Sequence, residues 1–428
     1  MRSVTREERS HRLRQYVCAA LTSACVWACG DEQTPGQHDL FDPGSVSIDA
    51  SVRLDASDGS TTDASEELDA TLDETVENTC RVRSEAVIAQ RFFDPQSPLA
   101  VAVHGQGALL GWSQYRGGKS RVLARWLGVE QGAAEAAGSD DDANQTELHS
   151  SATTTGFLTT WSDDRGGLRA RRTSDQGVVL DSTPITIAAS GAGSVSAQGA
   201  DGNMLVVFVG PARTQLLGTD ARPVGVAHEL PGFGAVIGRP ALAAFRDGYL
   251  LAWVDAATRG VQLQQLDQAG LAVGASQRVD SDGDAQGHLD LATTSVGGAL
   301  AWDMLVDGAR AEVRLRALGM DAKPTGNEQT LTPFPESGLQ PALVAARGGY
   351  LVAYRSAQGA TLALRLAMLD GRGKPIARGV MTVTGLEQQA LPLAMRMTDD
   401  GRQLFLGWLD LTPNTPDYQL QQAWMECD

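Results

Sequence analysis

A repeat of about fifty residues constrains the fold of this chain more than any other feature. In each copy an apolar run ends in one aromatic residue, and successive aromatics lie 45 to 54 residues apart. The seven aromatics are Trp112, Trp161, Phe208, Trp253, Trp302, Tyr354 and Trp408. A second run follows and alternates apolar with polar residues, as in 261–266 and 313–318. Alternation with a period of two is the pattern of β-strands, and no segment keeps a helical stripe over three turns. The repeat is therefore built from strands.

The fourth copy shows the full unit most clearly. Its four strand-like segments, separated by glycine-containing turns, are 240–245, 248–254, 261–266 and 276–279. Four short strands in each of seven copies predict an all-β fold, a seven-bladed β-propeller with four-stranded blades. The copies lack the Gly-His and Trp-Asp signature of WD40 repeats and the kelch pattern. The resemblance is therefore to the propeller architecture and not to a named propeller family.

The two ends of the repeat region are expected to meet. The last copy stops after three strands, and a strand-like run at 86–92 precedes the first copy. We expect this N-terminal strand to complete the last blade, which closes the ring of the propeller domain, residues 80–428. Cys427 then lies at the exit of the third strand and Cys80 at the entry of the fourth, where a hairpin turn stands in other blades. We expect a disulfide between them; the alternative is two unpaired thiols at the chain ends.

The start of the chain has the pattern of an export signal. Four arginines, the first at Arg2 and the last at Arg14, precede an apolar run at 16–28. A basic start, a short apolar core and small residues at its end are typical of a secretory signal peptide, here residues 1–28. The apolar run is shorter than the roughly 20 residues that a helix needs to span a bilayer. We therefore expect export from the cytoplasm.

The end of this leader reads Val26-Trp27-Ala28-Cys29-Gly30. It resembles a bacterial lipoprotein processing site, in which an aliphatic residue at −3 and a small residue at −1 precede the lipidated cysteine. Trp27 departs from that pattern, since −2 is usually small, and Cys25 is a competing site. Processing at Cys25 would leave Cys29 as an odd thiol in an oxidising compartment. The resemblance implies lipidation of Cys29 and a lipid anchor in a bacterial cell envelope, at the outer membrane or cell surface. The alternative is an ordinary cleaved signal peptide and a secreted protein.

Most of the negative charge lies in one segment. The chain has a net charge of −17, and residues 30–79 contain fourteen acidic residues and one basic residue. Low hydrophobicity with high net charge predicts a disordered, extended stalk, which with Cys29 forms the segment 29–79. Asp-Ala-Ser or Asp-Ala-Thr recurs along it, and such Asp/Ala-rich spacers resemble those of many bacterial surface lipoproteins. The remaining domain is only mildly acidic and has no basic motif, which excludes nucleic acid as a partner.

Acidic residues follow the repeat aromatics at the ends of the second strands. In a propeller these loops gather with the blade-linking loops on one face, which we take as the candidate ligand face. Its residues are Asp163, Asp164, Arg165, Asp255, Asp303 and Asp410. The alternative interpretation is structural, because aspartate favours turns by bonding its own backbone.

One blade-linking loop has the spacing of a weak calcium site. Asp280, Asp282 and Asp284 alternate along the chain, as do the first ligands of a calcium loop. The glycine stands at the fourth position and no glutamate occupies the twelfth, so calcium is a weak prediction. No other cofactor is predicted.

Two functions fit the sequence. The first is a non-catalytic binding module, expected to be monomeric, that recognises a protein or a glycan and touches the membrane only through its lipid anchor. The alternative is a glycan-active hydrolase or lyase that uses loop-face carboxylates as general acid and base. Common catalytic signatures are absent, and Gln114, Gly210 and Ser356 interrupt the ring of acids. The sequence therefore favours binding.

Overall fold

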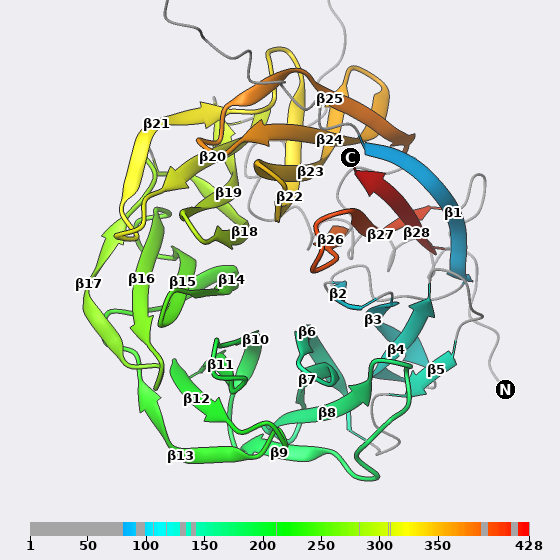
Figure 1. Cartoon of the computed structure of the whole chain (residues 1–428), viewed down its shortest axis with the longest axis vertical. Coiled ribbons are helices and arrows are strands. Elements are labelled where there is room, and N and C mark those ends of the chain that lie inside the picture. The colour runs from blue at the N-terminus through cyan, green and yellow to red at the C-terminus, as the bar shows by residue number, and fades with distance from the viewer. Residues whose placement is uncertain are drawn as a thin grey trace, which may run out of the picture. The chain divides into compact units, whose positions relative to one another are not determined.

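A computed structural model describes residues 80–90, 99–105, 107–116, 118–128, 134–137, 143–210, 212–281, 283–306, 308, 310–386, 393–411 and 418–427. The signal peptide, Cys29 and most of the acidic stalk, all within 1–79, lie outside these residues and stay predictions. The described strands form seven antiparallel four-stranded sheets arranged in a ring (Figure 1). The prediction of a seven-bladed β-propeller is confirmed.

Each of the first six blades consists of four strands that follow one another along the chain, from the centre of the ring outward (Figure 1). The strands of blades one to three are β2 (Ala100–His104), β3 (Gly107–Arg116), β4 (Lys119–Gly128), β5 (Ala134–Ala137), β6 (Gln145–Thr153), β7 (Gly156–Asp163), β8 (Leu168–Ser174), β9 (Ile185–Ala188), β10 (Ala192–Gln198), β11 (Met204–Val209), β12 (Arg213–Leu217) and β13 (Pro223–Glu229). Those of blades four to six are β14 (Val236–Phe245), β15 (Gly248–Asp255), β16 (Val261–Asp267), β17 (Ala272–Arg278), β18 (Ala285–Thr294), β19 (Gly297–Val306), β20 (Arg310–Leu318), β21 (Pro324–Thr330), β22 (Ser337–Ala346), β23 (Gly349–Gln358), β24 (Thr361–Asp370) and β25 (Pro375–Gly385). The seventh blade contains β26 (Leu393–Met397), β27 (Gln403–Leu411), β28 (Tyr418–Cys427) and β1 (Cys80–Gln90).

The repeat aromatics hold neighbouring blades together. All seven are buried, and each belongs to a core cluster that contains residues of the preceding blade. Trp302 of blade five, for example, packs with Leu250 and Leu263 of blade four. Large aromatic side chains bury about 150–250 Å² each, so one such residue per blade supplies much of the contact between sheets. This explains why the aromatic recurs once in every sequence repeat.

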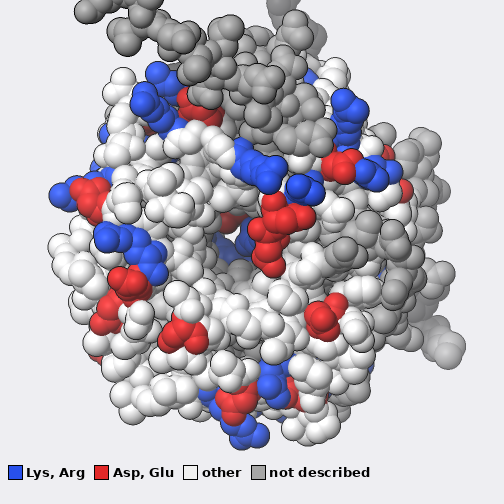
Figure 2. All heavy atoms as spheres, in the orientation of Figure 1, with Lys and Arg blue, Asp and Glu red and all other residues white. Residues whose placement is uncertain are grey.

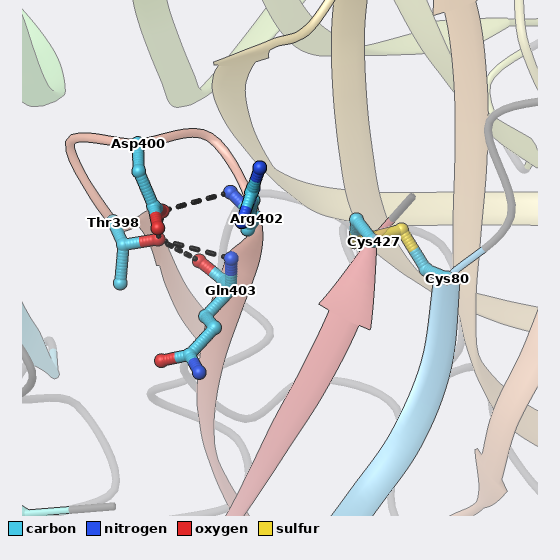
Figure 3. Close-up of a disulfide and its surroundings, with 6 residues drawn as sticks. All are labelled: Cys80, Thr398, Asp400, Arg402, Gln403 and Cys427. Atoms are coloured by element: carbon cyan, nitrogen blue, oxygen red, sulfur yellow. Dashed lines mark hydrogen bonds between the residues drawn. A yellow bond between two sulfur atoms is a disulfide. The ribbon is translucent and has the colours of Figure 1, made fainter. Parts of the chain in front are cut away.

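The ring closes as expected, through the N-terminal strand. β1 pairs with β28 in the sheet order β1-β28-β27-β26, and the register places Cys80 opposite Cys427. The two cysteines form a disulfide across a Cα–Cα distance of 4.1 Å. Figure 3 shows this bond beside the β26–β27 turn, where the hydroxyl of Thr398 contacts Asp400 at 2.6 Å. The strand begins at Cys80 and not at residue 86, because the disulfide stands at the first paired position.

Five consecutive inner strands contain a β-bulge at the same level of the propeller. The register of β6, β10, β14, β18 and β22 shifts against the second strand of each blade. At each bulge one residue has a positive φ: Glu147, Gly193, Gly238, Gly287 and Gln340. A bulge adds a residue and re-aims the adjacent side chain. It also explains why β14 begins at Val236, before the predicted start at residue 240.

Two bulge glycines of neighbouring blades lie in direct contact. A Cβ atom at Gly238 would lie 1.9 Å from the carbonyl oxygen of Gly287. No side chain fits at that distance, so the backbones of β14 and β18 can approach this closely only with glycine.

The Gly238→Ala substitution is expected to destabilise the fold more than Gly274→Ala. Both glycines have similar φ values, +69° and +71°, but a Cβ at Gly274 meets nothing within 4 Å. Gly274→Ala should cost about 1–2 kcal/mol of unfolding free energy through its backbone conformation. Gly238→Ala should cost a further 1–3 kcal/mol, roughly, through the clash. Urea denaturation measures both, and equal losses would refute the close approach of the two blades.

Removal of the disulfide should destabilise the closed ring. The bond joins residues 347 positions apart. Chain-entropy arguments give a long loop a stabilisation on the order of 5 kcal/mol. The Cys80→Ser/Cys427→Ser double variant should therefore unfold at a clearly lower urea concentration than the oxidised wild type. An unchanged midpoint would show that the β1–β28 pairing closes the ring without help from the disulfide.

Candidate functional site in the central channel

The inner strands of all seven blades line a central channel. It has a volume of about 390 Å³, and its walls come from β2, β6, β10, β14, β18, β22 and β26. Figure 2 shows an opening at the centre of one face, with basic and acidic side chains inside it. A volume of this size lies in the range of small-molecule sites in proteins, about 300–1,000 Å³.

The channel wall consists of strand edges, whose free backbone groups need partners outside their own sheet. Side chains of blade two supply such partners to blade three. The backbone N–H of Gly193 donates to the carboxylate of Glu147. The backbone N–H of Ser196 donates to Nδ1 of His149 at 3.3 Å. Glu147 and His149 therefore cap the open edge of the neighbouring blade.

Blade five caps blade six in the same way. The backbone N–H of Leu343 donates to Oδ2 of Asp290 at 2.9 Å. The backbone N–H of Gln340 donates to Oδ2 of Asp303 at 3.1 Å. Since these bonds pass from blade to blade, the polar side chains of the channel also hold the ring together.

Asp303 additionally orients a histidine. Its carboxylate is fully buried and lies 2.7 Å from Nδ1 of His288, whose side chain is 48% exposed. Burial alone lowers the pKa of His288, but the charge of Asp303 and the hydrogen bond to it outweigh burial and raise this pKa above its usual value. The arrangement leaves Nε2 of His288 available to other groups.

His149 has the opposite electrostatic environment. Burial is the main cause that holds the pKa of His149 well below its usual value, and the charges of Arg239 and Arg396 lower it further. The ring is therefore neutral at neutral pH. Because Nδ1 accepts the bond from Ser196, the ring proton is on Nε2.

Two arginines complete the charged groups of the channel. Arg396 on β26 donates from Nη1 to Asp290 on β18 at 3.3 Å, which links blades seven and five. Arg239 follows the bulge glycine Gly238 on β14, and burial lowers its pKa to about 10 while the charge of Glu147 opposes that shift. Arg239 keeps its positive charge at neutral pH.

The predicted acids of blade two are held by their own turn. The side chain of Asp163 is 1% exposed and accepts bonds from the amides of Arg165 and Gly167 and from Nε of Arg169, all at 3.0–3.1 Å. Asp164 is exposed and accepts a bond from Asn144 at 2.9 Å.

The other predicted acids also have local partners. Asp255 accepts two bonds of 2.8 Å from Thr258, and the backbone bond is the main cause that lowers the pKa of Asp255. Asp410 is buried and accepts a bond from the amide of Leu411 at 2.9 Å. Its charge raises the pKa of the buried Arg355, which burial lowers to about 10. The printed contacts do not bring the six predicted residues together; of these, Asp303 alone bonds a residue of the inner wall.

The two described aspartates of the proposed calcium loop bond to arginines. The buried carboxylate of Asp280 accepts bonds from Arg278 at 3.0 and 3.1 Å. Asp284 accepts a bond from Arg259 at 2.8 Å. Asp282 lies outside the described residues, and within the described ranges no three metal-ligating side chains converge. Calcium stays a prediction.

Sequence reasoning missed the channel residues because it searched the loops after the aromatics. The missed residues all lie in first strands: Glu147, His149, Arg239, His288, Asp290 and Arg396. A signal for two of them is visible in the sequence, since a glycine directly precedes a basic residue in Gly238-Arg239 and Gly287-His288.

Comparison with known proteins finds similar structures at low sequence identity. No family model matches the chain, and no curated protein matches it. The WD40 domain of Toxoplasma gondii coronin is 10% identical, with a TM-score of 0.47, over 80% of this chain and 86% of that one. The β-propeller domain of Swd1 from Myceliophteria thermophila is 14% identical, with a TM-score of 0.46, over 80% and 99%. An exo-β-1,3-galactanase from Phanerochaete chrysosporium is 8% identical, with a TM-score of 0.39, over 81% and 100%. Nothing about the ligand follows from these similarities.

The Asp303→Asn substitution is expected to destabilise the protein more at pH 6 than at pH 9. Because the folded pKa of His288 lies above the usual value of 6.5, protonated His288 stabilises the fold. This contribution is complete below the unfolded pKa and is lost as the pH rises through the folded pKa. Urea denaturation of both proteins across this range measures the difference. In a His288→Gln background the difference should become independent of pH, and a persistent pH dependence there would assign it to another group.

Proposed function

We propose that this protein is an exported, lipid-anchored protein of a bacterial envelope whose propeller is a non-catalytic binding module, with its ligand site in the central channel. The leader, the processing pattern at Cys29 and the acidic segment 30–79 support export and tethering. Fifty flexible residues have a root-mean-square reach of roughly 40 Å, and mutual repulsion of the acids lengthens it. In the part of the chain that the structure describes, no helix is long and apolar enough to cross a membrane.

The observation that carries the binding function is the channel itself. It is open and of ligand size, and polar groups from several blades converge on it. The loop-face acids fit catalysis less well. General acid and base catalysis on a glycan needs two available carboxylates, roughly 5–10 Å apart. Asp163, Asp303 and Asp410 are instead buried in bonds to neighbouring groups. This favours recognition over hydrolysis.

Metabolic labelling tests the tether. Cells that express the full chain and are fed a labelled fatty acid should incorporate the label into this protein. The Cys29→Ala variant should lose the label, because the lipidated thiol is gone, while the matched Cys25→Ala variant should keep it. A label that survives Cys29→Ala, or no label at all in the wild type, would overturn the lipid anchor.

A turnover assay on the purified protein tests the absence of catalysis. Acidic and neutral polysaccharides incubated with the protein should keep their chain length, measured by size-exclusion chromatography and reducing-end release. Chain shortening that disappears in Asp163→Ala or Asp255→Ala would favour the hydrolase or lyase instead.

A further inference from the structure

Arg239 is the exception among the charged groups of the channel. Glu147, His149, Asp290 and Asp303 each accept a bond from an edge amide of the next blade. Arg239 has no hydrogen bond or ion pair among the described residues, and its Nη2 atom is buried without a partner. Its role in the fold is therefore not that of a cap.

An unpaired buried guanidinium lowers stability, because its charge loses contact with water and gains no bond in return. The nearest countercharge named by its electrostatics is Glu147. That carboxylate already accepts bonds from the amide of Gly193 and, at 3.3 Å, from the hydroxyl of Ser162. An anion that enters the channel would supply the partner that the protein itself leaves out.

Other basic groups face the same place. Arg239 and Arg396 both act electrostatically on the ring of His149, although the three residues come from blades four, seven and two. His149 carries its proton on Nε2 and can donate it to an oxygen atom. The donors from three blades thus surround one region of the channel.

The rest of the wall is polar in a different way. The inner strands are sheet edges, so their remaining N–H and C=O groups face the channel, together with the side chains of Ser150, Ser151 and Ser196. Such a wall binds hydroxyl groups, which both donate and accept hydrogen bonds. A guanidinium prefers a carboxylate, which it binds through two parallel bonds.

We propose that the central channel binds a small hydroxylated carboxylate, of the sugar-acid class, whose carboxylate pairs with Arg239 and is supported by Arg396 and His149. This inference rests on the proposed binding function and names the chemistry of its ligand. The hydroxyl groups of the ligand bond to the free edges of the inner strands.

Glucuronate and glucose form a matched pair of probes, since they differ only in the carboxylate. The purified full protein is titrated with each, and affinity is measured by calorimetry and by the pH titration of the His149 ring signal in NMR spectra, assigned with His149→Gln. Glucuronate should bind and raise the pKa of His149, because its negative charge offsets the two arginines. Glucose should bind at least about tenfold more weakly, as expected for the loss of one charged hydrogen-bonded pair.

Variants locate the carboxylate. Arg239→Met should weaken glucuronate binding by about tenfold to a hundredfold and should leave the unliganded protein as stable as the wild type or more so. Arg222→Met is the matched control, because Arg222 is 77% exposed in an outer turn, and it should change neither. If Arg239→Met does not fold, Arg239→Lys keeps the charge without the planar fork and should still bind several-fold more weakly.

Three outcomes would overturn the inference. They are no binding of glucuronate, binding that Arg239→Met leaves unchanged, and binding of inorganic phosphate as tight as that of glucuronate, which would indicate a phosphate ligand. Any of these, found together with a fatty-acid label at Cys29 and no glycan turnover, would remove the sugar acid and leave the tethered binding module in place.

Discussion

The pairing of β1 with β28 is the contact on which the rest of the structure depends. A propeller assembled from consecutive blades has two loose ends, and here the chain joins them by placing its first strand on the outside of the last blade. The Cys80–Cys427 disulfide stands at the first paired position of that contact. Closure brings the seven inner strand edges to face one another around a common axis (Figure 1). The channel, and the need to satisfy its walls, both follow from closure.

Open strand edges must find hydrogen-bond partners, and this requirement accounts for most of the charged groups in the channel. Glu147 and His149 serve blade three, while Asp290 and Asp303 serve blade six. Once these structural roles are assigned, Arg239 remains as a charge that the fold does not use. Groups that reduce stability and make no internal contact are candidates for function, because functional sites commonly trade stability for activity. This reasoning moves the ligand site from the loop face to the axis of the propeller.

The sequence was sufficient for the architecture because its signals are local and repeated. Each repeat aromatic is a buried residue between blades, so Trp253 or Trp302 appears at the same place in every copy. The incomplete last blade and the two outlying cysteines predicted closure. The site was not predictable in the same way, because its contacts join distant positions: Arg396 and Asp290 lie 106 residues apart. The bulges that aim these side chains include positive φ values at Glu147 and Gln340, residue types that do not signal such a conformation. Aspartates after the aromatics were visible, but turns and ligand sites use the same residue there, as Asp163 and Asp255 illustrate.

A crystal structure of the protein with glucuronate is the most direct test that the channel is a ligand site and that Arg239 is its anchor. We expect the carboxylate of the ligand within hydrogen-bond distance of the Arg239 guanidinium, with its hydroxyl groups against the edges of the inner strands. Glucuronate bound on the loop face beside Asp163 or Asp255, with an empty channel and an unchanged Arg239, would contradict this assignment.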